Sequence, residues 1–321
     1  MKFNRDLRKK ITRGIKYPVF IFFIKVFIRS VRFFPRRFIL FTFGALGKLA
    51  FSWVPSESRR TIKVVEHIYK DKLSPKEIRK FGRSVFVHQA WNLADYFYTI
   101  NLKTRQQFSK YWEIEGEEYL KAEYEKGKGV LCLMCHRGSW EFSAIAPPIL
   151  GYETTAVSKA LKNARINEMI IKYRQNRGMK NLSRGKTYPL LLEAIGKGEC
   201  LIIMIDQDTQ VKGVFVDFLG KQAWTPIGAA RLAMDTKAPV VPMAMLRLPN
   251  NKHRFCIKPP IPLVDTGDYE ADVLANTINY TKAIEAFVAE APNQWVWMHE
   301  RWRTTPEIVD SWEKETGKKF R

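Results

Sequence analysis

Cysteine, acidic residues and long apolar runs are all scarce in this sequence. Its four cysteines in 321 residues are too few for a disulfide framework, and Cys200 and Cys256 stand in apolar surroundings typical of reduced core positions. No clean apolar stretch reaches the length of about 18–20 residues that marks an unambiguous transmembrane helix. No internal repeat or low-complexity segment is visible either.

Positive charge, in contrast, is abundant and concentrated near the N-terminus. The 54 lysines and arginines outnumber the 32 acidic residues, which gives a net charge of +22. Residues 1–60 hold 15 of the basic residues and only two acids, Asp6 and Glu57. Nucleic acids and anionic membrane surfaces both attract such a segment.

The residues between these charges favour a membrane surface. Lys25 and Lys48 are the only charges within two mostly apolar stretches, 17–28 and 38–54. The stretches are too apolar for a nucleic-acid-binding arm and predict helices that lie in or dip through the membrane interface. A span by residues 38–54 and a buried helical hairpin remain alternatives, whereas basic residues running through the apolar region disfavour a signal peptide. We expect residues 1–55 to anchor the chain on an anionic membrane surface, with no nucleic acid as partner.

Residues 56–321 are expected to form one α/β unit with a mixed, mostly parallel sheet flanked by helices. The sequence Ser74-Pro-Lys-Glu77 is a capping box that opens a helix reaching about residue 98. From residue 129 short apolar strands alternate with helices, which indicates such a sheet. The expected strands are 130–135, 154–157, 200–205, 240–246 and 254–257, and the expected helices are 141–150, 166–175, 190–195, 227–234 and 272–290.

The strand at 130–135 ends on His136, and Glu141 follows five residues later. A strand end, a tight turn at Gly138 and a helix start with Ser139 as N-cap would bring the two side chains together. The carboxylate would then hold the imidazole in one tautomer and leave the other nitrogen free to take a proton from a hydroxyl. The chemistry indicated is acyl transfer to an alcohol. A structural histidine at a strand end is the ordinary alternative.

Two other sites fit the same stretch less well. Cys132-Leu-Met-Cys135-His136 has the spacing of a c-type haem attachment motif, but the thiols fall inside a strand-like apolar run. A zinc site would need further ligands, and the remaining histidines are scattered. We therefore expect no cofactor and no metal.

Three further segments are candidates for the site. Asp206-Gln207-Asp208 follows directly after the strand at 200–205, so it could bind metal, orient a substrate or simply form a turn. Residues 215–228 are apolar and glycine-rich, which suits either an acyl-chain groove or core packing. Residues 295–303 concentrate indoles and guanidinium groups. The default interpretation is a capping surface helix, with interfacial aromatics or an anionic-substrate clamp as the alternatives.

In this order, these blocks resemble the bacterial lipid A biosynthesis (late) acyltransferases over nearly the whole chain. The resemblance includes the basic apolar N-terminus and five sequence blocks: His136–Glu141, Ser158-Lys159-Ala, Lys197-Gly-Glu, Asp206-Gln-Asp208 and Trp297-Met-His-x-Arg-Trp. It implies an acyl-carrier-protein or acyl-CoA thioester as donor and a glycolipid hydroxyl, such as that of a lipid A precursor, as acceptor. It also implies a bacterial inner-membrane location with the catalytic domain on the cytoplasmic face.

The resemblance implies catalysis by His136 as general base, with Glu141 orienting it. We expect the substrate-binding residues to be Arg137, Gly138, Lys159, Arg184, Asp206, Gln207 and Asp208. Backbone N–H groups at the helix start Gly138–Ser139, with Arg137 or Arg184, would hold the oxyanion. No covalent acyl-enzyme is needed, and Cys135 is expected to point to the opposite face of its strand.

Gln210 replaces the usual glycine of the family, which leaves the acceptor open. Related enzymes acylate other glycolipids, including mannosylated phosphatidylinositol. Glycerol-3-phosphate and lysophosphatidate acyltransferases are the nearest rival enzymes, but their Pro-Glu-Gly block is not found. A membrane lipid-binding protein without activity is the remaining alternative.

Overall fold

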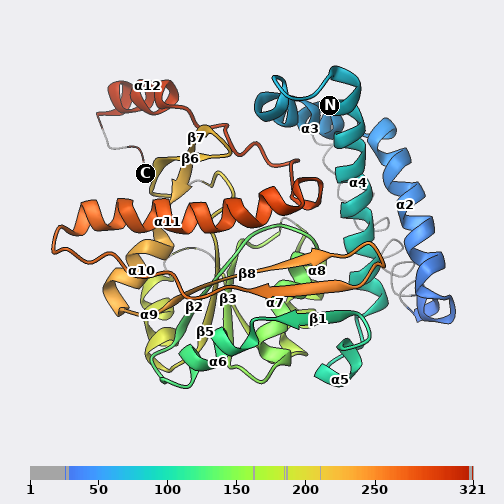
Figure 1. The fold of residues 1–321 in the computed structure, drawn as a ribbon, viewed down its shortest axis with the longest axis horizontal. Helices are drawn as coiled ribbons and strands as arrows, with labels where there is room; N and C mark the ends of the chain where they lie inside the picture. The colour runs from blue at the N-terminus through green and yellow to red at the C-terminus, as the bar shows by residue number, and fades with distance from the viewer. Residues whose placement is uncertain are drawn as a thin grey trace, which may run out of the picture.

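A seven-stranded sheet forms the centre of the protein (Figure 1). The computed structural model describes residues 26, 29–161, 163–183, 185, 187–209, 211–317 and 320. The strand order is β1-β9-β8-β2-β5-β3-β4, and every neighbouring pair is parallel except β8 and β9. The expected α/β architecture with a mixed, mostly parallel sheet is thus confirmed. The strands of this sheet are β1 (Trp112–Glu115), β2 (Val130–Met134), β3 (Thr154–Ser158), β4 (Met179–Ser183), β5 (Cys200–Met204), β8 (Val240–Arg247) and β9 (His253–Ile257).

Helices cover both faces of this sheet. One hydrophobic core lies under α9 (Tyr188–Gly196), α10 (Gly228–Thr236) and α11 (Tyr269–Glu290), and α11 runs across the front of the sheet in Figure 1. The other core lies under α5 (Arg105–Phe108), α6 (Glu117–Tyr124), α7 (Trp140–Ile149) and α8 (Ala164–Gln175). Because side chains alternate along a strand, β2 supplies both cores: Leu131 and Leu133 face the first, and Cys132 and Met134 face the second.

All the helices and strands expected between residues 74 and 290 are present, but four strands were not expected. β1 and β4 are the two edge strands, and both are short and carry polar residues. Short, polar edge strands resist unwanted pairing with other chains. For the same reason they lack the apolar run by which a buried strand is recognised in a sequence. The other two, β6 (Gly213–Phe218) and β7 (Lys221–Pro226), form an antiparallel hairpin outside the sheet.

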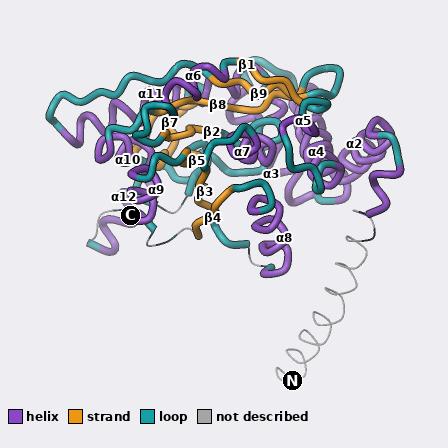
Figure 2. Tube along the Cα trace, turned by 90° about the horizontal axis from the view of Figure 1, so that it is seen from below, coloured by secondary structure: helices purple, strands orange, loops and turns teal. Residues whose placement is uncertain are grey.

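Helix α2 (Arg36–Trp53) packs along α4 (Pro75–Tyr98) at one end of the sheet, opposite α9 and α10 (Figure 2). Two glycines permit the close approach: a Cβ on Gly44 would lie 2.8 Å from the Trp91 indole nitrogen, and one on Gly47 would lie 2.8 Å from the Phe86 carbonyl oxygen. The Ser74 capping box at the start of α4 is confirmed.

The apolar stretch at 38–54 coincides with α2, whereas nearly all of the stretch at 17–28 lies outside the described residues. Within the described part of the chain, no single helix is long and apolar enough to cross a membrane. Together, α2 and α3 (Pro55–Tyr69) meet the criteria of length and composition, but a 90° bend separates them. The remaining described elements are the 3-10 turns Val31–Phe33 and Pro292–Gln294 and the helix α12 (Pro306–Thr316).

Candidate active site

The parallel pairing of β2 with β5 brings His136 next to Asp206. The register joins Val130 to Cys200 and Met134 to Met204, and each of the two polar residues follows its strand by two positions. The carboxyl ends of parallel strands meet at one edge of a sheet, which is where open α/β sheets bind their ligands. The imidazole and the carboxylate therefore face each other at this edge.

The Asp206 carboxylate makes two hydrogen bonds with His136 and one with Trp295. Its Oδ1 lies 2.8 Å from His136 Nδ1, and its Oδ2 accepts the His136 backbone N–H at 2.7 Å and the Trp295 indole N–H at 2.8 Å. Asp206 is fully buried, which by itself raises the pKa of its carboxyl, but the positive charge and hydrogen bonds of His136 and the Trp295 donor lower that pKa overall. The ionised carboxylate is thus favoured, and the imidazole that it contacts is partly exposed.

The expected pairing of His136 with Glu141 is not what the structure shows. The Glu141 carboxylate forms a two-pronged ion pair with Arg174 of α8, at 2.7 Å and 3.1 Å. Arg174 also donates to Asn181 of β4, so it ties α7 to the far edge of the sheet. The register of β2 against β5 therefore pairs His136 with Asp206, 70 residues away, and not with Glu141, five residues away.

The turn after His136 depends on Gly138. Its φ is +56°, and a Cβ there would lie 2.3 Å from the Met245 carbonyl oxygen, so no larger residue fits. Its N–H donates to the Gln294 carbonyl oxygen and its own carbonyl accepts from Asn92. The expectation that the Gly138 amide holds an oxyanion is therefore wrong, since that N–H is already engaged.

Ser139 stands at the N-cap of α7 as expected, but its side chain makes no capping hydrogen bond. Its carbonyl accepts the amides of Phe142 and Ser143, which are the first amides to donate within the helix. The amides of Trp140 and Glu141 precede them in the first turn. Together with the Ser139 amide, they are the remaining candidates for an oxyanion contact.

Arg137 does not face the site, which corrects the expected substrate contact. Its fully buried guanidinium donates to the Phe287 carbonyl oxygen and to Glu290, both on α11, and lies over the Phe287 ring. The alternation of side chains past the end of β2 sends it to the face opposite His136. Arg184 lies outside the described residues, and Lys159 is exposed in the loop after β3.

Asp208 fixes the C-terminal segment. Its carboxylate accepts the Thr304 amide at 2.7 Å and an Arg303 N–H at 3.3 Å, so it acts as a loop anchor. Gln207 is half-buried between the two aspartates. In the described part of the chain, no three His, Cys, Asp or Glu residues gather closely enough to hold a metal ion.

The surface helix expected at 295–303 is wrong. Trp295, Trp297 and Arg301 of this segment are fully buried, and beyond a 3-10 turn the segment is irregular. It supplies the Trp295 donor to Asp206, and it places the His299 ring 6.5 Å from that of His136. The clustered indoles marked the segment in the sequence, but its contact with Asp206 depends on tertiary packing.

The thiol and the apolar hairpin near the site serve packing. Cys135 is fully buried, and burial raises the pKa of its thiol far above the usual range, which opposes a nucleophilic role. Phe218 of β6 packs its buried ring against Trp295 and Trp302. The segment at 215–228 therefore contributes to the core behind the dyad of His136 and Asp206.

Comparison with known proteins points to one enzyme family. The family model described as bacterial lipid A biosynthesis acyltransferase matches residues 8–304. The chain is 26% identical over 213 residues to a lipid A biosynthesis acyltransferase of Haemophilus influenzae, covering 66% of this chain and 65% of that protein. It is 27% identical over 216 residues to the lipid A biosynthesis lauroyltransferase of Escherichia coli, covering 64% and 66%.

A phosphatidylinositol mannoside acyltransferase of Mycobacterium tuberculosis is 29% identical over 133 residues, which cover 40% of this chain and 42% of that protein. The matches to these three relatives span less than two thirds of their lengths. The family model, in contrast, extends over most of the sequence, from the basic N-terminal region to the segment that contacts Asp208. The chain therefore belongs to the bacterial lipid A biosynthesis acyltransferase family.

Proposed function

We propose that this protein transfers a fatty acyl group from a thioester to a hydroxyl of a lipid A precursor or a related glycolipid. The observation that carries the proposal is the pair of His136 and Asp206 at the carboxyl edge of the sheet. Family membership supplies the reaction class. The donor is an acyl-carrier-protein or acyl-CoA thioester.

His136 acts as the general base in this proposal. Its Nε2 takes the proton of the acceptor hydroxyl as that oxygen attacks the thioester carbonyl, while Asp206 accepts the Nδ1–H and stabilises the imidazolium. The tetrahedral intermediate then collapses, the carbon–sulfur bond breaks, and Nε2 returns the proton to the departing thiolate. The acceptor is itself the nucleophile, so no acyl-enzyme is required.

The start of α7 is our candidate for the oxyanion contact. The amides of Trp140 and Glu141 lie in its first turn, where the helix dipole favours negative charge. The Trp140 ring lies 6.1 Å from the ring of His136, so this turn borders the proposed base. Glu141 then acts through Arg174: their ion pair fixes the turn that presents these amides.

The membrane location is also part of the proposal. One face of α2 packs on α4, and its other face exposes large apolar side chains, among them Phe41, Leu46 and Trp53. Arg37 and Lys48 lie on the same helix and suit anionic headgroups. We assign residues 1–55 to a membrane-anchoring region and 56–321 to a catalytic domain on the cytoplasmic face of the bacterial inner membrane.

The test is a transfer assay on detergent-solubilised protein. Acyl-carrier-protein and acyl-CoA donors are each combined with a tetra-acylated lipid A precursor, a mannosylated phosphatidylinositol and a lysophospholipid. We expect product with at least one glycolipid and its loss in His136→Ala, with the thermal unfolding of the variant as the control for folding. Transfer only to the lysophospholipid would overturn the acceptor class. Lipid binding without transfer in any combination would favour a non-catalytic lipid-binding protein.

A further inference from the structure

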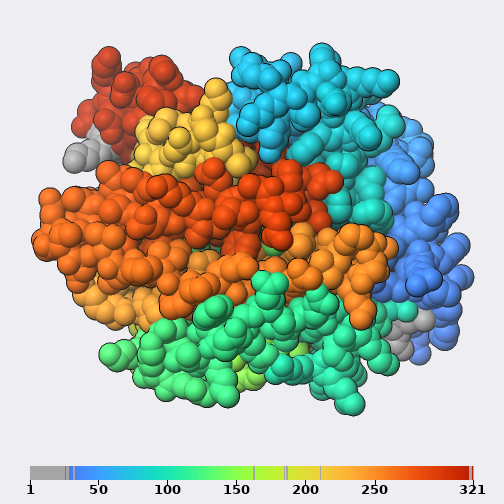
Figure 3. Space-filling view, viewed as in Figure 1, coloured from blue at the N-terminus to red at the C-terminus, as the bar shows by residue number. Residues whose placement is uncertain are grey.

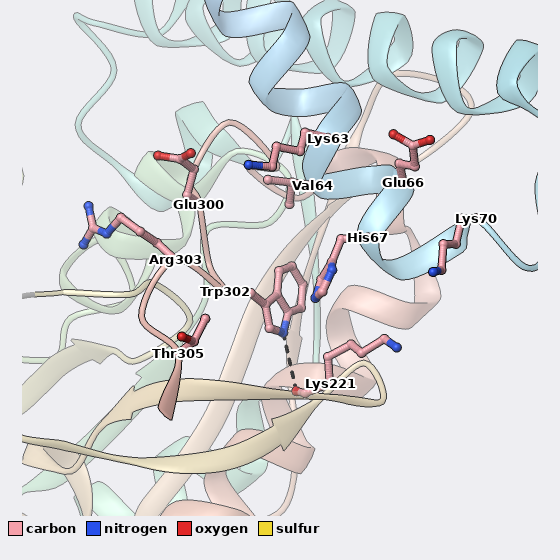
Figure 4. A pocket seen from close by; sticks show the side chains of 10 residues that line it. All are labelled: Lys63, Val64, Glu66, His67, Lys70, Lys221, Glu300, Trp302, Arg303 and Thr305. Atoms are coloured by element: carbon pink, nitrogen blue, oxygen red, sulfur yellow. Dashed lines mark hydrogen bonds between the residues drawn. The ribbon is translucent and has the colours of Figure 1, made fainter. Parts of the chain in front are cut away.

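A cavity lined by α3 and by residues that follow His299 carries no assigned role. It has a volume of about 560 Å³ and opens between α3, the β6–β7 hairpin and residues 300–305 (Figure 4). Glu300, Trp302 and Arg303 line it, and they follow directly after His299, whose ring lies 6.5 Å from that of His136. One continuous segment therefore joins the wall of this cavity to the proposed base.

Three lysines give the cavity its charge. Lys63 and Lys70 come from α3 and Lys221 comes from the start of β7. None of the ion pairs between described residues involves any of the three. Desolvation lowers the pKa of the neighbouring His67 imidazole, and the charges of Lys221, Lys70 and Lys63 lower it further. All three ammonium groups thus act on the same imidazole.

Neither of the two carboxylates that line this cavity forms an ion pair with the three lysines. Glu66 lines the cavity, but in Figure 4 its carboxylate points away from His67 and Trp302. Glu300 lies within 3.6 Å of Arg60, with which it forms an ion pair. Among the described residues, therefore, no carboxylate forms an ion pair with the lysines around His67.

An aromatic wall completes the cavity. The Trp302 indole lies 5.8 Å from the His67 ring, stacks on Trp297 and donates a long hydrogen bond to the Lys221 carbonyl oxygen. Lysines bind phosphate as mobile point charges, and an indole face suits the apolar part of the same ligand. The cavity has the size of one headgroup and is far too small for a protein surface.

We propose that this cavity binds a phosphate group carried by one of the two substrates, which anchors that substrate while its reacting group lies at His136. The inference rests on the proposed acyl transfer. The phosphate comes either from the headgroup of an anionic glycolipid acceptor or from the phosphopantetheine arm of the donor. Both present the same chemistry to Lys63, Lys70 and Lys221.

The test compares two triple variants with the same change in charge. K63Q/K70Q/K221Q removes the lysines of the cavity. K110Q/K121Q/K128Q removes three exposed lysines near β1 and α6, on the side of the molecule opposite α3 (Figure 3). Comparable thermal unfolding of both triples and the parent protein checks their folding.

Kinetics identify the substrate that carries the phosphate. We expect the cavity triple to raise the KM of one substrate by about tenfold or more, with kcat within about twofold of the parent, because charge-assisted contacts to an anchoring group are lost. A rise only with the phosphorylated form of the acceptor, and not with its dephosphorylated form, assigns the phosphate to the acceptor. A rise for the donor alone assigns it to the phosphopantetheine arm. Equal effects in the two triples, or unchanged KM values for both substrates, overturn the proposal.

A binding measurement separates this inference from the proposed reaction. Inorganic phosphate and 4′-phosphopantetheine are titrated into the full chain while the ring resonances of His67 are followed. Shifts that vanish in the cavity triple and persist in the control triple support the anion site even if no acyl transfer is found. Transfer activity without any such shift in the parent overturns the anion site and leaves the reaction standing.

Discussion

His136 Nδ1 lies 2.8 Å from Asp206 Oδ1, although the two residues are 70 positions apart in the chain. The two residues meet because β2 and β5 are parallel neighbours in register, not because of any short sequence motif. A buried carboxylate behind an imidazole keeps the base in the correct tautomer, as in the serine proteases. Glu141, the nearer carboxylate in sequence, serves Arg174 instead.

Asp206→Asn is expected to reduce kcat by roughly 10³- to 10⁴-fold without unfolding the protein. Oδ2 accepts two N–H donors, from the His136 backbone and from Trp295, which have no alternative orientation. The amide oxygen of asparagine must take that position, so its NH₂ group faces Nδ1 of His136. The imidazole must then carry its proton on Nε2, where it cannot accept one from a hydroxyl. Steady-state kinetics measure the loss, and ¹⁵N shifts of the imidazole report the change of tautomer.

Glu141→Gln is the comparison variant for the same assay. It weakens an ion pair with Arg174 and leaves the contact of His136 with Asp206 in place. We expect a smaller reduction in kcat than in Asp206→Asn, and an imidazole tautomer that stays as in the parent protein. If Glu141→Gln changed the tautomer and Asp206→Asn did not, the assignment of Asp206 as the orienting carboxylate would be wrong.

Trp295→Phe tests the donor behind Asp206. Phenylalanine keeps an aromatic ring beside Phe218 and Trp297 but removes the N–H that donates to Oδ2. A hydrogen bond to a charged group contributes about 1.5–3 kcal/mol. We expect kcat to fall by about tenfold with KM little changed, because the carboxylate loses one of the contacts that hold it. A change in KM alone would show that Trp295 acts on substrate binding rather than on the dyad.

Gly138→Ala is expected to destabilise the protein and to abolish transfer. The residue has φ +56°, and a Cβ would collide with the Met245 carbonyl oxygen, so the turn between His136 and α7 must move. Gly127→Ala is the matched control, since its φ is +68° but no atom lies within 4 Å of a Cβ there. In the control, we expect the free energy of unfolding to fall only by the cost of a left-handed backbone at alanine, about 1 kcal/mol. Urea unfolding of both variants measures the difference, and equal losses would contradict the role of the close contact.

The sequence predicted the architecture well because apolar strands and helical spacing are local properties. β2 and β5 are short buried runs bounded by turns, and both lie where the pattern placed them. The edge strands β1 and β4 escaped because their polar residues resemble loops. For the site, proximity along the chain suggested Glu141, whereas the contacts of Asp206 and Trp295 required the register of the sheet and the path of a buried irregular segment.

The exposed face of α2 predicts binding to anionic vesicles through apolar side chains. Phe41 and Trp53 are 75% and 73% exposed, and each large side chain that inserts contributes roughly 1.5–3 kcal/mol. We expect Phe41→Ser/Trp53→Ser to reduce co-sedimentation with phosphatidylglycerol-containing vesicles by tenfold or more, about the effect of 1.4 kcal/mol. Leu274→Ser/Ile308→Ser is the control, since both residues are exposed but lie on α11 and α12. Equal losses in the two pairs would contradict a specific membrane face on α2.

Two histidines, the fully buried His253 and the half-buried His88, predict that the protein loses stability in mild acid. Burial first, and then the positive charge of Arg247, lower the pKa of His88 and of His253 to about 4. The unfolded chain takes up protons on both near pH 6.5, so their contribution to the free energy of unfolding is complete above that pH and declines from there down to about pH 4. The slope from the pair approaches about 2.7 kcal/mol per pH unit.

His253→Gln isolates one of these two protons. The histidine donates its Nε2–H to Asp95 at 2.9 Å, and Arg247 and Arg36 also contact this carboxylate. A glutamine amide can replace that donor without titrating. Urea unfolding between pH 7 and pH 4 should show about half the parent slope in His253→Gln or His88→Gln. The double variant should lose most of the slope. An unchanged slope in all three variants would place the acid sensitivity in other groups, such as the paired carboxylates.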